Sequence, residues 1–192
     1  MILLEAARRE AQATLIARHY TGSVPSGKSV YIQFDAAIVV FSIPANKNIA
    51  RYLGFERVWE LSRLWAPDGH EPNLLTKALS HAVAEFRTAE PAVEALVSYA
   101  DPNVGHHGGI YKAASWIACG QSEESRLYKN AEGAVVSRRA FHSGKKSLRK
   151  AEILALGYVQ LKGQGKLRYV KPLTGKARRA FAKRATALSK AA

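Results

Sequence analysis

A short stretch in the middle of the chain combines side chains whose types suit proton transfer. An apolar run predicts a strand that ends at Ala100, and Asp101 follows it directly. Ligands of α/β sheets bind beyond the carboxyl ends of strands, where a carboxylate can act as a general base or orient an amine, and a tyrosine such as Tyr111 can protonate a leaving group. Ser98 alternates away from Asp101, so both reach one substrate only if the strand bulges or ends. The structural alternatives are a capping role for Asp101 before Pro102 and simple aromatic packing for Tyr111.

Two adjacent histidines lie between Asp101 and Tyr111, in the loop Gly105 to Gly109. Glycines allow close approach of the backbone to a ligand, and the helix predicted to follow presents an N-terminus that attracts anions. A pair of histidines without a third ligand does not predict a metal site. We therefore predict no metal-binding residues, although the sequence does not settle whether the chemistry uses a metal.

The strand expected over Val58–Trp65 carries an arginine among large apolar side chains. Strict alternation places Arg63 on the same face as Trp59, Leu61 and Trp65. A buried arginine costs free energy unless it is paired or used. Arg63 therefore either contacts an anion or substrate, or extends its guanidinium to solvent at the sheet edge.

A histidine and a tyrosine end the first predicted helix. His19 either caps the last carbonyls or lines an acceptor site together with Tyr20. The loop that follows, Gly22 to Ser29, matches the phosphate-loop pattern letter for letter. That chemistry needs a strand before the loop and a helix after it, whereas here the order is reversed, and Pro25 removes a backbone donor. We reject the phosphate-loop interpretation, while Lys28 could still touch a substrate phosphate.

Hydrophobic periodicity predicts alternating helices and strands. Strand–helix–strand units favour parallel pairing, and a hairpin leads into them, so we expect an α/β fold with a mixed central sheet flanked by helices. Asn73 is expected to cap the clearest helix. The expected helices cover 3–18, 74–86, 110–117, 145–156 and 176–190, with a short helix or irregular segment over 44–54, and the expected strands cover 29–34, 37–43, 58–65, 95–100, 126–130 and 135–139.

Charge divides the chain into two parts. Residues 1–137 hold 13 basic and 14 acidic residues, whereas 138–192 hold 16 basic residues and one acidic residue. We therefore expect a neutral catalytic body over 1–137 and a basic extension over 138–192 that completes the sheet and contacts nucleic acid. An anionic membrane surface, the ribosome and a merely solubilising tail are the alternatives. The predicted nucleic-acid contacts are Arg138, Arg139, Lys145, Lys146, Arg149, Lys150 and Arg168.

Several classes of protein are excluded by composition. The single cysteine, Cys119, rules out an intrachain disulfide and the paired-cysteine zinc site of nucleobase deaminases. No apolar run is long enough to span a bilayer, and the chain begins with a charged helical pattern instead of a signal peptide. We expect an intracellular, cytoplasmic protein with no membrane partner.

The middle of the chain resembles a known family. The order of elements from residue 58 to residue 117 is similar to the core of the GCN5-related N-acetyltransferase (GNAT) superfamily, and Ile110 to Gly120 resembles its second motif, in which a tyrosine in a short helix precedes an aromatic residue and a glycine. More narrowly, Ser98 to His106 running into Gly109 to Ala113 resembles the Mom family of phage DNA-modification proteins, as does Arg168-Tyr169-Val170. The resemblance covers roughly residues 55–172.

This resemblance implies a GNAT-like acyltransferase fold and an enzyme that adds a methylcarbamoyl (acetamido) group to N6 of adenine in double-stranded DNA, which protects phage DNA from restriction. It places Ser98, Asp101 and Tyr111 in the reaction site, with His106 nearby. Arg63, His19 and Tyr20 are further candidates for donor or acceptor contacts. The adenine base has to flip out of the duplex, which costs about a few kcal/mol.

The expected cofactor loop departs from the superfamily. Acetyltransferases bind the coenzyme A pyrophosphate before the long helix, but Pro67 to Asn73 holds a single glycine together with Asp68 and Glu71. Acidic residues match a pyrophosphate poorly. The donor is therefore an acyl-type molecule of unknown identity, and acetyl-CoA is disfavoured.

Two other functions stay open. One is a conventional acetyl-CoA-dependent N-acetyltransferase acting on a protein or small amine, which tight acetyl-CoA binding without DNA would indicate. The other is a non-enzymatic nucleic-acid-binding module, in which Asp101 and Tyr111 serve only stability.

Overall fold

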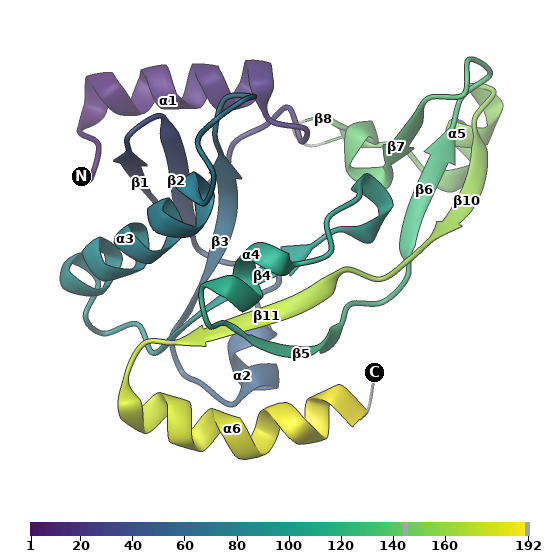
Figure 1. The fold of residues 1–192 in the computed structure, drawn as a ribbon. Coiled ribbons are helices and arrows are strands. Elements are labelled where there is room, and N and C mark those ends of the chain that lie inside the picture. The colour runs from purple at the N-terminus through teal and green to yellow at the C-terminus, as the bar shows by residue number, and fades with distance from the viewer. Residues whose placement is uncertain (144–145, 191–192) are drawn as a thin grey trace. The chain divides into compact units, whose positions relative to one another are not determined.

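The computed structural model describes residues 1–143 and 146–190 (Figure 1). The helices are α1 (Glu5–Arg18), α2 (Ile49–Leu53), α3 (Leu74–Ala89), α4 (Gly109–Ala113), α5 (Lys150–Ala155) and α6 (Gly175–Lys190), with 3-10 turns at Pro102–Val104 and Arg138–Phe141. The strands are β1 (Ser29–Phe34), β2 (Ala37–Ser42), β3 (Val58–Trp65), β4 (Ala95–Ala100), β5 (Ile117–Gln121), β6 (Ser125–Lys129), β7 (Val135–Ser137), β8 (His142–Ser143), β9 (Lys146–Ser147), β10 (Val159–Gly163) and β11 (Leu167–Pro172).

A six-stranded sheet in the order β1-β2-β3-β4-β11-β5 forms the centre of the fold. β1 and β2 form an antiparallel hairpin, in which Asp35 adopts a left-handed conformation at the turn, and β2 pairs antiparallel with β3. β3 pairs with β4 in parallel, through a crossover that contains α3. The expected α/β fold with a mixed sheet is therefore confirmed.

The two faces of this sheet are covered by different helices. On one face, the Phe86 ring of α3 lies 4.7 Å from Phe41 of β2 and 5.1 Å from Trp59 of β3, measured between centroids. On the opposite face, α1 buries Ala11 and Leu15 against β1 and β2. α2 and α6 share a second cluster on that face with β3, β4, β5 and β11 (Figure 1).

A bulge in β3 corrects the predicted placement of Arg63. Leu61 pairs with Phe41, but Arg63 pairs with Val40, so the register shifts by one residue at Ser62. The shift turns the second half of β3 over. Trp59 and Leu61 therefore face α3, whereas Arg63 and Trp65 lie on the opposite face, and Trp65 packs against the α1 cluster.

The chain forms two compact units, each of which is described by itself. Unit 1 comprises residues 1–99, 108–120 and 168 onward, with the six-stranded sheet as its core. Unit 2 comprises residues 100–107 and 121–167, with the three-stranded sheet β10-β6-β7. Its core includes Tyr128 and Ile153, both fully buried. The basic segment that begins at residue 138 is thus shared between the units, because the chain returns to unit 1 at Arg168.

Four local expectations differ from the structure. The predicted helix over 110–117 is shorter, because Ser115 takes a left-handed conformation after α4 and Ile117 begins β5. The predicted helix over 145–156 begins at Lys150, where the Glu152 carboxylate accepts the backbone N–H of Arg149. Asn73 precedes α3, but it is left-handed and its side chain makes no capping hydrogen bond. No residue ranges were predicted for strands β10 and β11, which lie in the segment that was expected to complete the sheet.

Two other sequence-based conclusions can be compared with the fold. The loop that resembles a phosphate loop lies between helix α1 and strand β1, the reverse of the order that phosphate binding needs, so its rejection is confirmed. Over the described residues, no helix combines the length and the apolar character needed to cross a membrane.

Candidate functional site

Ser98 and Tyr111 form a hydrogen-bonded pair inside unit 1. Ser98 lies on β4 and is 2% exposed, and its Oγ lies 3.0 Å from the Tyr111 hydroxyl and 3.1 Å from the Leu61 carbonyl of β3. A serine has one hydroxyl hydrogen, and a carbonyl oxygen can only accept. When Ser98 donates to Leu61, Tyr111 must donate to Ser98. The pair therefore holds the tyrosine proton at a defined place.

The environment of Tyr111 keeps its phenol protonated. Burial raises the pKa of Tyr111 to about 12. At neutral pH the group is therefore a hydrogen-bond donor or acid, and a phenolate base is excluded. This matches the predicted role of Tyr111 as a donor to a leaving group, which remains a prediction.

Aromatic contacts fix the position of the Tyr111 ring. Tyr169 of β11 stacks on it at 4.9 Å, and Trp116 lies 5.5 Å away, between centroids. Gly108 lies directly against the Tyr169 side chain. Its φ is +77°, and a Cβ there would lie 2.2 Å from the Tyr169 hydroxyl oxygen. Only glycine fits both the conformation and the space, so the start of α4 is held close to β11.

Tyr20 lies close enough to Tyr111 to influence its ionisation, since a negative charge on Tyr20 raises the pKa of Tyr111 further. Tyr20 is 54% exposed and its ring lies 4.5 Å from that of His19. The His19 Nδ1 accepts the backbone N–H of Thr21 at 3.2 Å. The structure therefore places His19 beside Tyr20, and Tyr20 within electrostatic range of Tyr111.

Arg63 holds the loop that follows Tyr20. Its guanidinium donates to the Ser23 carbonyl at 2.8 Å and to the Ser23 hydroxyl at 3.1 Å. These bonds satisfy an otherwise costly charge. In this structure Arg63 positions the loop, and its predicted substrate contact remains a prediction.

β3 and β4 separate beside the pair. Their parallel pairing covers only Val58–Ala95 to Glu60–Val97, although β3 continues to Trp65 and β4 to Ala100. Beyond that point the Leu61 carbonyl accepts a hydrogen bond from the Ser98 hydroxyl instead of from a backbone amide of β4. Separation at the carboxyl ends of parallel strands is the usual place for a ligand in such sheets.

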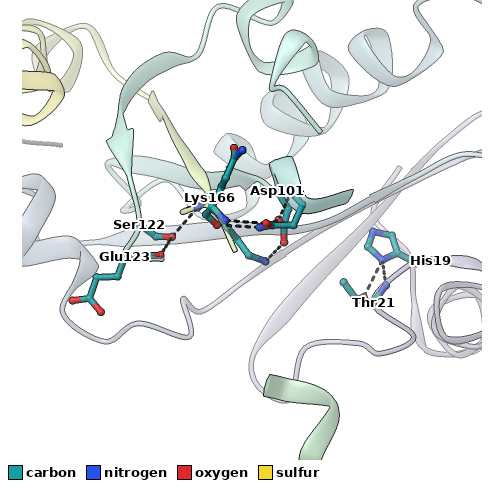
Figure 2. A network of polar contacts seen from close by, with 8 residues as sticks. His19, Thr21, Asp101, Ser122, Glu123 and Lys166 are labelled. Carbon is teal, nitrogen blue, oxygen red and sulfur yellow. Dashed lines mark hydrogen bonds and ion pairs between the residues drawn. The ribbon is translucent and has the colours of Figure 1, made fainter. Parts of the chain in front are cut away.

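Asp101 belongs to unit 2 and is held by a polar network (Figure 2). Its Oδ2 lies 2.8 Å from the Lys166 ammonium, and its Oδ1 accepts the side-chain and backbone N–H groups of Asn103 at 2.8 and 3.1 Å. Asp101 thus caps the turn Pro102–Val104, as the structural alternative predicted, and also forms an ion pair.

The network makes Asp101 a charged acceptor. Burial alone would raise the pKa of Asp101, but the hydrogen bonds and charge of Lys166, together with the bonds from Asn103, lower it below its ordinary value. An aspartate with a depressed pKa is a weak base and a good acceptor of hydrogen bonds. Lys166 is itself anchored, because its backbone N–H donates to Ser122 Oγ at 2.9 Å.

The remaining predicted residues are distributed over both units. His106 is exposed in unit 2, with its backbone N–H bonded to the Asp101 carbonyl. Arg138 donates to the Leu148 carbonyl at 3.4 Å, and Arg149 and Lys150 are exposed. Lys145 lies outside the described residues. Arg139 lies in a 3-10 turn and Lys146 in β9.

The Mom protein family model matches residues 1–190. This chain belongs to the Mom family. Over 70 residues it is also 36% identical to the methylcarbamoylase Mom of Escherichia phage Mu, a match that covers 36% of this chain and 29% of that protein.

Arg168 has a different place in this Mom-family protein from the one expected. It lies on β11 in the central sheet and is 8% exposed, with its guanidinium 4.6 Å from the Tyr52 ring centroid and 5.9 Å from that of Tyr99. It also donates to the Cys119 carbonyl at 3.4 Å. These contacts give Arg168 a role inside unit 1, whereas we expected an exposed side chain in a basic tail.

Sequence reasoning missed Lys166 and Tyr169 as site residues. Lys166 lies more than 50 positions from Asp101, and Tyr169 lies more than 50 positions from Tyr111, so no local spacing connects these pairs. The signal available for Tyr169 was the alternation of Arg168, Tyr169 and Val170, which places Tyr169 alone on the Tyr111 side of the sheet.

The loop between β3 and α3 is acidic. A cavity of about 500 Å³ beside it is lined by Asp35, Glu71, His70 and Lys77, so two carboxylates face one ammonium. The first backbone N–H of α3, that of Leu74, is bonded to the Glu71 carbonyl. Among the described residues, no group of three or more histidine, cysteine, aspartate or glutamate side chains could hold a metal ion.

Proposed function

We propose that this Mom-family protein modifies DNA by transferring a methylcarbamoyl group to N6 of adenine, and so protects phage DNA from restriction in the bacterial cytoplasm. The observation that carries the proposal is the Ser98–Tyr111 pair beside the separated carboxyl ends of β3 and β4, in a chain that the family matches over residues 1–190. The named activity of the phage Mu relative supplies the reaction.

Tyr111 is proposed to assist the leaving group. In the transfer, N6 forms one bond to the transferred carbon and loses one proton, while the leaving group departs with its bonding electrons. In the resting arrangement the Tyr111 hydroxyl donates its hydrogen bond to Ser98. As negative charge develops on the leaving group, this hydroxyl can turn and donate its proton there. As that proton leaves, the Ser98 hydrogen can turn from the Leu61 carbonyl to the tyrosine oxygen and stabilise the negative charge that develops there.

Asp101 is proposed to accept a hydrogen bond from the exocyclic amine. The adenine N6 lone pair is delocalised, so orientation of the amine matters. As N6 bonds to carbon it becomes positively charged and acidic, so even a carboxylate of low pKa can receive its proton. Lys166 keeps Asp101 ionised for this role.

The fold proposed for unit 1 is GNAT-like. The succession β3-α3-β4-α4, with β3 and β4 parallel and Tyr111 in α4, supports it. The acidic lining beside the β3–α3 loop argues against acetyl-CoA, so we propose an acyl-type donor of another class.

DNA is proposed to enter as a duplex whose adenine flips out. Exposed Tyr20 beside Tyr111 is suited to stack on the extruded base. The exposed cations Arg149 and Lys150 of unit 2 are suited to bind backbone phosphates.

Mass spectrometry of nucleosides from plasmid DNA tests this function. Cells that express the protein should yield deoxyadenosine heavier by a methylcarbamoyl group, and Asp101→Asn should abolish the product while the purified variant still folds and binds DNA. The same experiment should be done in a natural host of the phage, which supplies the donor and any partner. Unmodified deoxyadenosine in host cells that contain the folded wild-type protein would contradict the proposal.

A further inference from the structure

A cavity in unit 1, apart from the Ser98–Tyr111 pair, gathers positive charge from separate elements. It measures about 220 Å³, and its walls include Arg87 of α3, Trp116 and Lys171 of β11. The rest of the wall is mainly apolar, from α3 and the end of α4. The proposed reaction uses neither Arg87 nor Lys171, and Trp116 takes part in it only as a neighbour of the Tyr111 ring.

A second cavity continues the first on the other side of Arg87. It measures about 370 Å³, shares Ala84 and Arg87 with the first, and extends to Thr174. The Thr174 carbonyl accepts the backbone N–H of Arg178 in the first turn of α6. Arg178 is exposed, and its charge and that of Arg87 reach the Lys171 ammonium.

These three cations lack counter-charges. Among residues 1–143 and 146–190, no carboxylate forms an ion pair with Arg87, Lys171 or Arg178. Burial, then the charges of Arg178 and Arg87, lower the pKa of Lys171, so the three groups repel one another. The Lys171 ammonium donates to the Ala114 carbonyl at 2.7 Å, which leaves donor capacity for a ligand.

A buried donor also lacks a partner in the cavity wall. Trp116 is 5% exposed, and within the described part of the chain its indole N–H makes no hydrogen bond. Buried donors of this kind are rare and call for an explanation. An anion that entered the cavity could accept this bond after a small adjustment of the ring and would also neutralise the repelling charges.

We infer that the cavity bounded by Arg87, Trp116 and Lys171 binds a phosphate group. Guanidinium and ammonium groups together are the usual ligands of phosphate, and Arg178 adds positive charge that reaches Lys171. The apolar wall admits the organic part of a phosphate ester. The phosphate can belong to a small molecule or to the DNA backbone, and the site does not depend on the proposed methylcarbamoyl transfer.

Nuclear magnetic resonance of the full chain tests this inference. The chain has three tryptophans, so the Trp116 indole signal can be assigned by its loss in Trp116→Phe. Inorganic phosphate should shift this signal with saturation. In Arg87→Gln the affinity should fall about tenfold, as expected when a charged hydrogen bond is lost. Arg87 is exposed, so the variant should fold.

Lys77→Gln is the matched control, because it removes a charge from an exposed position of the same helix outside both cavities. It should bind phosphate as the wild type does. A short DNA duplex that produces the same Arg87-dependent shift would identify the backbone as the source; a shift by inorganic phosphate alone would identify a small phosphate. No saturable shift with either probe, or an equal response in Arg87→Gln, would overturn the inference whether or not the protein modifies DNA.

Discussion

At the scale of single residues, two acidic groups are tuned in opposite directions. Burial raises the pKa of Tyr111, which keeps its proton, whereas Lys166 and Asn103 outweigh burial and lower the pKa of Asp101, which stays charged. One group can therefore donate while the other accepts at the same neutral pH. The proposed transfer needs one group that can donate a proton and one that can accept it at neutral pH.

The Asp101–Lys166 pair predicts a defined pH dependence. A depressed carboxyl pKa stabilises the fold above the unfolded pKa, and this stabilisation is lost as pH falls through the folded pKa. Lys166→Met should raise the Asp101 pKa and move the loss of stability to higher pH. Carbon NMR of the Asp101 carboxyl group measures its pKa, and urea denaturation over a pH series measures the stability.

Lys162→Met provides the control, since Lys162 lies on β10 and its ion pair with Glu124 is exposed. It should leave the titration of Asp101 unchanged. If Lys166→Met also leaves it unchanged, the ion pair does not set the charge of Asp101.

At the scale of elements, the contact between α4 and β11 decides where Tyr111 lies. Gly108→Ala would force a left-handed alanine and a collision with Tyr169. We expect a loss of about 1–3 kcal/mol in the free energy of unfolding and a displaced Tyr111 ring. Urea denaturation and near-ultraviolet circular dichroism measure the two effects.

The adjacent glycine offers a matched comparison. A Cβ at Gly109 meets no atom within 4 Å, and its φ is not positive. Gly109→Ala should therefore be neutral or slightly stabilising. Equal losses in both variants would mean that the Gly108–Tyr169 contact does not fix α4.

The elements that were predicted and those that were missed differ in a physical way. α1, the β1–β2 hairpin, β3, α3 and β4 have clear apolar periodicity, and each was expected within a few residues. β11 is buried in the sheet, yet its segment, Leu167–Pro172, reads as basic because Arg168 and Lys171 point toward partners from distant parts of the chain. The Ser62 bulge has no local signal either, so the face of Arg63 could not be predicted.

The candidate site shows the same limit. Ser98, Asp101 and Tyr111 were identified from local chemistry and family resemblance, because they lie within 14 consecutive positions. Their partners Lys166 and Tyr169 come from a return of the chain more than 50 residues later. The sequence identified the groups that we propose to react, and the fold added the groups that set their protonation and position.

At the scale of the whole molecule, the uneven charge predicts steeply salt-dependent DNA binding. Each phosphate contact that is lost should reduce the slope of log affinity against log salt by about 1. Arg149→Gln with Lys150→Gln should lower the slope by about 2, as measured by fluorescence anisotropy of labelled duplex DNA over a salt series.

Lys47→Gln with Lys77→Gln removes the same charge from exposed positions in the neutral part of the sequence. That control should change the slope much less. Equal changes in the two double variants would assign DNA binding to net charge alone and contradict a specific role of unit 2.

The most direct measurement of the proposed function compares two tyrosine variants by mass spectrometry of plasmid nucleosides. Tyr111→Phe removes only the hydroxyl that Ser98 holds, whereas Tyr31→Phe removes a hydroxyl from a buried tyrosine elsewhere in unit 1. At equal protein levels, Tyr31→Phe should modify adenine as the wild type does, and Tyr111→Phe should reduce the modification about a hundredfold or more. Full modification by Tyr111→Phe would contradict the central claim that its buried phenol drives the transfer.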